Sequence, residues 1–177
     1  MWTMRENEEP ARPVVRVTRR YRFSAAHRLH APELSEERNR EVYGKCNNPY
    51  GHGHDYVMDV TLRGPLDTRL GRLVSVDQFD QFVRCTIVDA FDRRNLNLDV
   101  PEFATLVPTT ENLALVAAHR LAAAWPLAFP GCAALPEKVR IWETPRNIFE
   151  VYVASPKHSS VMDESAGRHS APNEESK

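Results

Sequence analysis

The stretch HGHDYVMDVTLR, residues 52–63, decides how this sequence is expected to fold and where its chemistry lies. We predict a β-strand here, and side chains along a strand alternate between its two faces with a period of two. His52 and His54 therefore project from the same face, and two imidazoles on one face suit a single metal ion. An H-x-H pattern alone is a weak indication, because a chain with seven histidines also produces it by chance.

The other elements are found by reading outward from this strand. β-Branched and aromatic residues near a period of two predict an earlier strand from Val14 to Phe23. Apolar residues at helical spacing predict one helix over Ser75–Phe91, with Cys85 as a small hydrophobic residue in it. A second helix is expected over Glu111–Ala124, which Pro126 should end. Two last strands are expected over residues 138–143 and 148–153.

The order strand, strand, helix, helix, strand, strand predicts an α+β fold. Two hairpins with a helix pair between them indicate an antiparallel sheet covered by the two helices on one face. The edges of such a sheet are exposed and favour pairing with other subunits, so assembly is a hypothesis at this point.

Composition excludes several classes of protein. Of the 177 residues, 42% are hydrophobic and 27% charged, which is ordinary for one globular domain. No apolar run approaches the roughly 20 residues of a membrane-spanning helix, so no membrane partner is expected. The 23 Lys and Arg nearly balance the 24 Asp and Glu, which leaves no positive field to gather nucleic acid.

The two ends of the sequence and its cysteines indicate the cellular compartment and the limits of the folded domain. The first ten residues lack the apolar core of a secretory signal, and three cysteines do not suggest a disulfide framework, so a cytoplasmic protein is expected. One folded domain is predicted over residues 12–154. The polar ends, residues 1–11 and 155–177, have little to bury and are expected to be disordered.

His27 extends the H-x-H pair into a candidate metal site. An antiparallel partner strand could bring it beside His52 and His54, and Gly51 and Gly53 let the backbone bend closely around a ligand. Three histidines without a fourth protein ligand are typical of catalytic zinc, because the open position takes water or a substrate oxygen. The alternative is that these histidines are surface or hydrogen-bonded core residues.

Cys46 is the candidate reactive thiol. It lies in a loop of turn-forming residues before His52, next to Lys45. A metal and a cation nearby would depress its pKa, so it could act as a base or a nucleophile.

Four separated blocks of the sequence resemble one known family. They are FSAAHRLHAPELSEERNREVYGKCNNPYGHGHDY (residues 23–56), FDRRNLNLDVPEF (91–103), PTTENLA (108–114) and VRIWETPRNIFEVYV (139–153). Their order and content resemble the 6-pyruvoyl-tetrahydropterin synthase family across nearly the whole folded unit. The resemblance implies a tunnelling fold of the predicted element order, whose sheets join into a barrel in trimers that stack as hexamers. It also implies active sites shared between subunits of a homo-oligomer.

The resemblance further implies the chemistry and its residues. His27, His52 and His54 would bind Zn²⁺, and Cys46 would be the catalytic base. The substrate would be 7,8-dihydroneopterin triphosphate, a pterin, and the enzyme a carbon–oxygen lyase that releases triphosphate. Glu143 would anchor the pterin ring, whose NH and NH2 donors match two acceptor oxygens. Further substrate-binding residues would be Thr109, Thr110 and Glu111, which would also suit the start of a helix.

One departure from the family concerns the block FDRRNLN. The family typically carries an Asp-His pair there, so Asp92 is retained but Arg93 stands in the histidine position. Arginine stays protonated and cannot shuttle a proton as histidine does. Either Cys46 and Asp92 suffice, with Arg93 as a fixed positive charge, or the enzyme is slow, altered or inactive.

Two rival functions follow from the same resemblance. One is the related 6-carboxy-tetrahydropterin synthase of queuosine-type deazapurine synthesis, whose cysteine usually lies closer to the HGH, as in C-x-x-x-HGH. Here five residues separate Cys46 from His52, which favours the pyruvoyl synthase. The other rival is a zinc- and pterin-binding homologue with reduced or no turnover, a reading that only Arg93 supports.

Overall fold

The computed structural model describes residues 12–153, and the expectations about both ends of the chain lie outside this range. Its five strands form one sheet in the order β3-β1-β2-β4-β5. Their bounds are β1 Val14–His27, β2 His52–Pro65, β3 Arg94–Asn95, β4 Leu135–Trp142 and β5 Ile148–Tyr152. The helical segments are α1 Glu36–Tyr43, η1 Gly44–Asn47, α2 Val76–Val83, η2 Arg84–Val88, α3 Asp89–Phe91, α4 Leu96–Asp99, η3 Pro101–Ala104 and α5 Thr110–Ala128.

The α+β fold with two antiparallel hairpins is confirmed, with additions. Strands β1 and β2 pair along their full length, and β4 with β5 closes the other side of the sheet. The sheet is not wholly antiparallel as predicted, because β3 runs parallel to Ala25 and Ala26 of β1. This two-residue strand forms where the chain leaves α3 and passes along the outer edge of β1. A strand of two residues is too short to show the alternation from which the other strands were predicted.

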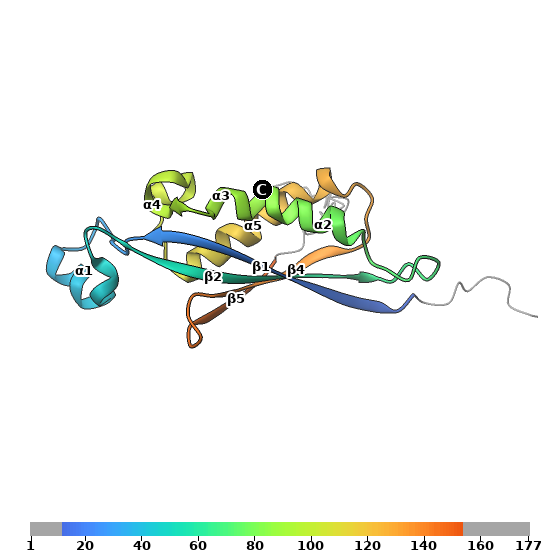
Figure 1. Cartoon of the computed structure of the whole chain (residues 1–177), viewed down its shortest axis with the longest axis horizontal. Coiled ribbons are helices and arrows are strands. Elements are labelled where there is room, and N and C mark those ends of the chain that lie inside the picture. The colour runs from blue at the N-terminus through green and yellow to red at the C-terminus, as the bar shows by residue number, and fades with distance from the viewer. Residues whose placement is uncertain (1–11, 154–177) are drawn as a thin grey trace, which may run out of the picture.

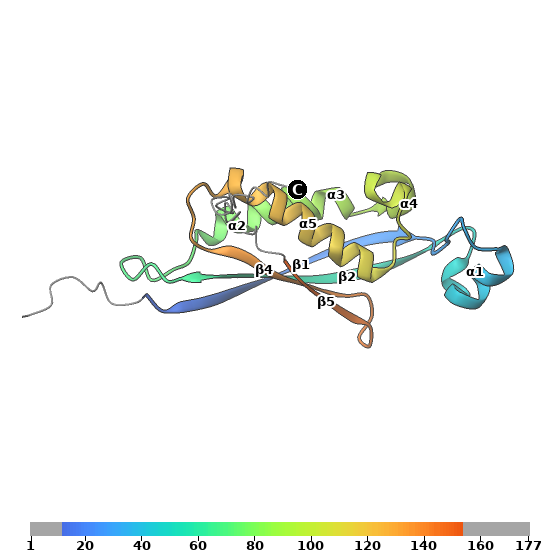
Figure 2. The same ribbon diagram turned by 180° about the vertical axis from the view of Figure 1, so that it is seen from behind.

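The helices cover only one face of the sheet. Figure 1 shows α2, α3 and α5 lying side by side on that face, and Figure 2 shows the same layers from behind. Inward-facing residues of β2 such as Met58, Val60 and Leu62 are fully buried, and they form one core with apolar residues of α2 and α5 such as Phe79 and Leu121. The alternation of buried and exposed residues along β1 and β2 fixes which side chains face this core.

The opposite face of the sheet, here called the open face, is charged. Arg16 forms a bidentate ion pair with Glu137, and Arg20 forms another with Asp59. The guanidinium of Arg20 also lies 4.9 Å from the centre of the Trp142 ring. No helix among residues 12–153 covers these side chains.

Two helix predictions need correction. The helix predicted over 75–91 forms as α2, η2 and α3 in succession, but η2 is a π-helical segment that changes the phase of the buried face. Cys85 is exposed rather than packed in the core, because it lies two residues from both of the buried residues Val83 and Ile87 and therefore on the opposite side of the helix. Pro126 does not end the second helix, because it lies in the last turn of α5, where one lost backbone hydrogen bond is tolerated. The Trp125 indole donates to the Ala134 carbonyl at 3.0 Å and holds this turn in place.

Candidate metal centre and active site

The pairing of β1 with β2 brings the three histidines together. His27 lies directly opposite His52 across the hairpin, and His54 follows two residues later on the same face. The Nε2 atoms of His27 and His52 are 3.2 Å apart, and one ligand atom from each of the three residues lies within 4.8 Å of the others. The predicted metal-ligand set is thus assembled in space, and His27 is fully buried.

The surroundings keep His27 and His52 in the form that binds metal. Burial lowers the pKa of both residues, helped by the neighbouring histidines, so their imidazoles are neutral at pH 7. Nδ1 of His27 lies 2.7 Å from the carbonyl oxygen of Pro108 and donates to it, which leaves Nε2 as the free acceptor.

Two other nitrogens in the cluster have no partner. Nδ1 of His52 and Nε2 of His54 are buried and make no hydrogen bond within residues 12–153. Buried polar atoms are rarely left unpaired, so imidazoles converging in this way fit a zinc-like ion with an open fourth position.

Gly51 sets the approach of β2 to His27. Its φ is +69°, and a Cβ atom there would lie 2.9 Å from the His27 carbonyl oxygen. Only glycine therefore fits at this point. The bend expected from the sequence at Gly51 is present.

Glu143 stands beside the histidines at the end of β4. Its Oε1 accepts a hydrogen bond of 2.7 Å from the Thr110 hydroxyl and lies 3.8 Å from Nε2 of His54. Its Oε2 accepts from the side-chain amide of Asn147 at 3.1 Å. Burial raises the pKa of Glu143, but the hydrogen bonds from Thr110 and Asn147 and the nearby histidines outweigh this effect, so the net pKa is lowered. The carboxylate is ionised, and each oxygen keeps a further acceptor site.

Tyr56 completes the inward-facing row of β2 after His52 and His54. Its side chain is 1% exposed, and its ring centre lies 5.5 Å from that of His54. Burial, with smaller contributions from Glu143 and Cys46, raises its pKa and outweighs the lowering effect of the Thr110 hydroxyl, so Tyr56 remains a phenol. Its hydroxyl has no hydrogen-bond partner in the described part of the chain.

Cys46 lies in η1, just before β2, and is partly buried. Its backbone carbonyl accepts from the Leu29 amide at 2.9 Å, which ties η1 to the segment that follows His27. The thiol is near enough to Tyr56 to influence the pKa of the phenol. Cys46 therefore belongs to the same end of the hairpin as the histidine cluster.

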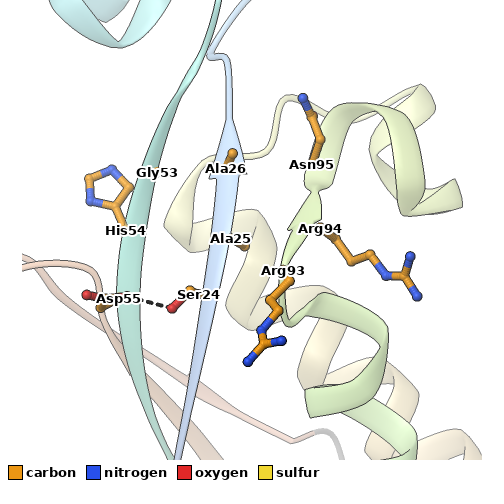
Figure 3. A pocket seen from close by; sticks show the side chains of 9 residues that line it. All are labelled: Ser24, Ala25, Ala26, Gly53, His54, Asp55, Arg93, Arg94 and Asn95. Carbon is orange, nitrogen blue, oxygen red and sulfur yellow. Dashed lines mark hydrogen bonds between the residues drawn. The ribbon is translucent and has the colours of Figure 1, made fainter.

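Asp92 and Arg93 lie at the outer edge of β1, where both bond to the backbone of Ser24. Oδ1 of Asp92 accepts from the Ser24 amide at 2.9 Å, and the Arg93 amide donates to the Ser24 carbonyl at 2.6 Å. The Arg93 backbone has a φ of +58°, and its side chain is 91% exposed, with Nε 3.7 Å from Asp92 Oδ2. Figure 3 shows Arg93 and His54 on opposite sides of the β1–β2 hairpin. Neither residue contacts the histidine cluster of its own chain.

The three residues of the PTTEN block that were expected to bind substrate lie in different surroundings. Thr109 is the N-cap of α5 and accepts from the Asn112 amide, Thr110 reaches Glu143, and Glu111 is exposed in the first turn. Only Thr110 enters the candidate site from this chain.

Sequence reasoning missed Tyr56, although the period of two that placed His54 would also have placed it. It missed Asn147 and the Pro108 carbonyl too, because no short-range pattern marks them.

The fold and the site together define an α+β protein with a three-histidine centre beside a partly buried carboxylate. The family model described as 6-pyruvoyl tetrahydropterin synthase matches residues 16–153. The chain is 46% identical over 139 residues to the 6-pyruvoyl tetrahydrobiopterin synthase of Poecilia reticulata, covering 78% of this chain and 90% of that protein. It is 39% identical over 132 residues to that of Homo sapiens, covering 75% and 87%.

A solved structure gives the same result. The 6-pyruvoyl tetrahydropterin synthase of Caenorhabditis elegans superposes with a TM-score of 0.74 at 38% identity, covering 81% of this chain and 99% of that one. This chain belongs to the 6-pyruvoyl tetrahydropterin synthase family. No helix among residues 12–153 is long and apolar enough to cross a membrane.

Proposed function

We propose that this chain is a zinc-dependent lyase that converts 7,8-dihydroneopterin triphosphate to 6-pyruvoyl-tetrahydropterin with loss of triphosphate. The observation that carries the proposal is the convergence of three imidazoles next to the ionised Glu143, in a chain related throughout to proteins of that name. A cytoplasmic location is proposed with it.

His27, His52 and His54 would hold the ion. When bound, zinc polarises a side-chain oxygen of the substrate and makes protons on the adjacent carbons easier to remove. The protein contributes the fixed orientation of the imidazoles, through the Pro108 carbonyl on His27 and the close approach at Gly51.

Glu143 would recognise the pterin ring. Its two oxygens each keep an acceptor site after bonding Thr110 and Asn147, and adjacent NH and NH2 groups of a pterin match such a pair. Cys46 would act as the base, taking a proton from the substrate side chain as the internal redox step begins. Its place at the same end of the β1–β2 hairpin supports this role.

Asp92 and Arg93 would serve the site of a neighbouring subunit in a homo-oligomer, with trimers stacked as a hexamer. Three observations support this: neither residue contacts its own histidine cluster, the Arg93 side chain is 91% exposed, and its backbone is held in the left-handed region. Thr109 and Glu111 complete the proposed substrate-binding set.

Arg93 would provide a fixed positive charge. It lines an open pocket of about 430 Å³ together with Arg94, and two guanidinium groups there would stabilise an enolate or hold a phosphate. Replacing Arg93 by His distinguishes this role from a missing proton shuttle: a lower rate in Arg93→His supports the fixed charge, and a higher rate supports the shuttle.

The deciding experiment is a product assay on purified protein whose zinc content has been measured. Incubation with 7,8-dihydroneopterin triphosphate should give 6-pyruvoyl-tetrahydropterin and free triphosphate, with one metal ion per chain. A carboxy-pterin with released acetaldehyde would instead identify the 6-carboxy synthase activity. Stoichiometric zinc and pterin binding without any product would identify a non-catalytic homologue.

A further inference from the structure

Tyr56 presents a buried hydroxyl that no group within residues 12–153 satisfies. Its side chain is 1% exposed, and its ring stacks on Phe23 with centres 5.1 Å apart and an angle of 23° between the planes. This packing, with His54 at 5.5 Å on another side, fixes where the hydroxyl lies. The oxygen is buried and has no hydrogen-bond partner within residues 12–153.

The groups around this hydroxyl are those proposed to handle the substrate. The Tyr56 ring lies beside two of the histidines, with its centre 5.5 Å from that of His54 and 6.4 Å from that of His27. The Thr110 hydroxyl is already bonded to Glu143 at 2.7 Å. Glu143 in turn faces His27 and His54, with Nε2 atoms 4.0 and 3.8 Å from its Oε1. The Tyr56 side chain thus packs against the histidine cluster, on the inward face of β2 where the candidate site lies.

Tyr21 shows what a tyrosine with a structural role looks like in the same sheet. It also faces the helices from β1 and is 9% exposed, but its hydroxyl bonds Asp80 at 2.8 Å. An unpaired buried hydroxyl is destabilising, and folded proteins rarely contain one without a functional reason. The unpaired Tyr56 hydroxyl is explained if a bound ligand supplies the acceptor for its hydrogen bond.

We propose that Tyr56 is a positioning residue for the pterin substrate, donating a hydrogen bond to an acceptor atom of the substrate that lies between the histidine cluster and Glu143. The inference rests on the proposed function, because it needs a pterin in this site. An ionised carboxylate only accepts hydrogen bonds and a metal-binding imidazole nitrogen gives its lone pair to the ion. Tyr56 therefore supplies a donor that these groups lack. A dihydropterin offers matching acceptors in its ring nitrogens and side-chain oxygens.

The test compares two substitutions that each remove one phenolic oxygen. Tyr56→Phe and Tyr21→Phe are prepared zinc-loaded beside the wild type, and binding of 7,8-dihydroneopterin, which has no triphosphate to lose, is measured by its fluorescence. Tyr56→Phe should bind this pterin about tenfold more weakly, as expected for the loss of one hydrogen bond. Tyr21→Phe should bind it as the wild type does. Zinc content should be one ion per chain in all three proteins.

Thermal unfolding gives the second measurement. Without ligand, Tyr56→Phe should unfold at the same temperature as the wild type or a few degrees higher, because it removes an unpaired buried hydroxyl. Tyr21→Phe should unfold at a lower temperature, because it breaks the bond to Asp80.

Each other outcome has a clear meaning. Equal pterin binding by Tyr56→Phe and the wild type would overturn the inference while leaving the proposed function intact. A marked loss of thermal stability in Tyr56→Phe would also overturn it, since the hydroxyl would then be structural. Absence of pterin binding by zinc-loaded wild-type protein would overturn both the inference and the proposed function.

Discussion

At the scale of single residues, the candidate metal centre depends on the protonation and tautomer of its histidines. Burial lowers the pKa of His27, and the Pro108 carbonyl fixes the proton on Nδ1, so that Nε2 faces the cluster. His52 is less buried but faces the same point from the opposite strand. The ligand set is thus preorganised by backbone geometry.

We expect His52→Ala to lose stoichiometric metal binding while keeping the fold, because two imidazoles hold zinc far more weakly than three. The matched control is His119→Ala, which removes an exposed histidine of α5 outside the cluster and should retain one ion per chain. Metal analysis after dialysis measures the difference, and circular dichroism reports the fold. Full zinc content in His52→Ala would contradict the assigned ligand set.

At the scale of the elements, the start of β2 must fit against the end of β1. Gly51 provides this fit, because any side chain there would press on the His27 carbonyl. Gly71 also has a positive φ, of +66°, but nothing lies within 4 Å of where its Cβ would be. The two glycines separate the effect of backbone strain from the effect of close contact.

Gly51→Ala should therefore reduce zinc affinity and lower stability by more than Gly71→Ala does. Strain at a positive φ costs roughly 1–2 kcal/mol in both variants, and the contact with His27 adds to it only at position 51. Urea unfolding and competition with a zinc chelator measure the two effects. Equal zinc affinities in the two variants would show that the close approach at Gly51 is unimportant for the metal centre.

A second contact between elements joins β1 to α2. Asp80 of α2 accepts hydrogen bonds from Arg19 and from the Tyr21 hydroxyl. The hydrogen bond from Arg19 is the main reason that the pKa of Asp80 is lowered. A lowered acid pKa stabilises the fold above the unfolded-state pKa of about 4, and this stabilisation is lost as the pH falls through the folded-state value.

We expect Asp80→Asn to be less stable than the wild type at pH 7 and the difference to narrow as the pH falls below about 4. Asp77→Asn, which neutralises an exposed acid on the same helix, should show neither effect. Urea midpoints measured across this pH range provide the comparison. A difference that does not change with pH would mean that the carboxylate charge is not responsible.

At the scale of the whole molecule, the proposed catalytic groups are divided. Cys46 lies with the histidine cluster, whereas Asp92 and Arg93 are bonded to Ser24 at the outer edge of β1. The open face and the long, mostly unpaired edge of β1 offer surfaces through which subunits could meet. Under the proposed function, a complete site would require more than one copy of the chain.

Complementation tests this division directly. Cys46→Ala and Asp92→Asn should each be nearly inactive alone, but mixed oligomers refolded from both should regain activity, up to about a quarter of the wild-type sites in a random mixture. Each variant refolded alone serves as the control. If all the catalytic groups came from one chain, no hybrid would contain a complete site and the mixture would stay inactive.

Much of this protein was predictable from the sequence because the patterns that matter are local. Alternation placed His52 and His54 on one face, and apolar periodicity placed the helices between the two hairpins. These features depend on neighbours a few residues apart. The loop position of Cys46 made it the candidate reactive thiol, whereas its role as the base and the role of Glu143 in binding the pterin came from the family resemblance, and these roles stay predictions.

Tertiary structure alone decided how distant segments meet. The hairpin register set His27 opposite His52, and the packing of α5 against β4 joined Thr110 to Glu143. Only the packed core left the Tyr56 hydroxyl buried without a partner. Burial, desolvation and long-range pairing depend on segments far apart in the chain, so a local pattern cannot specify them.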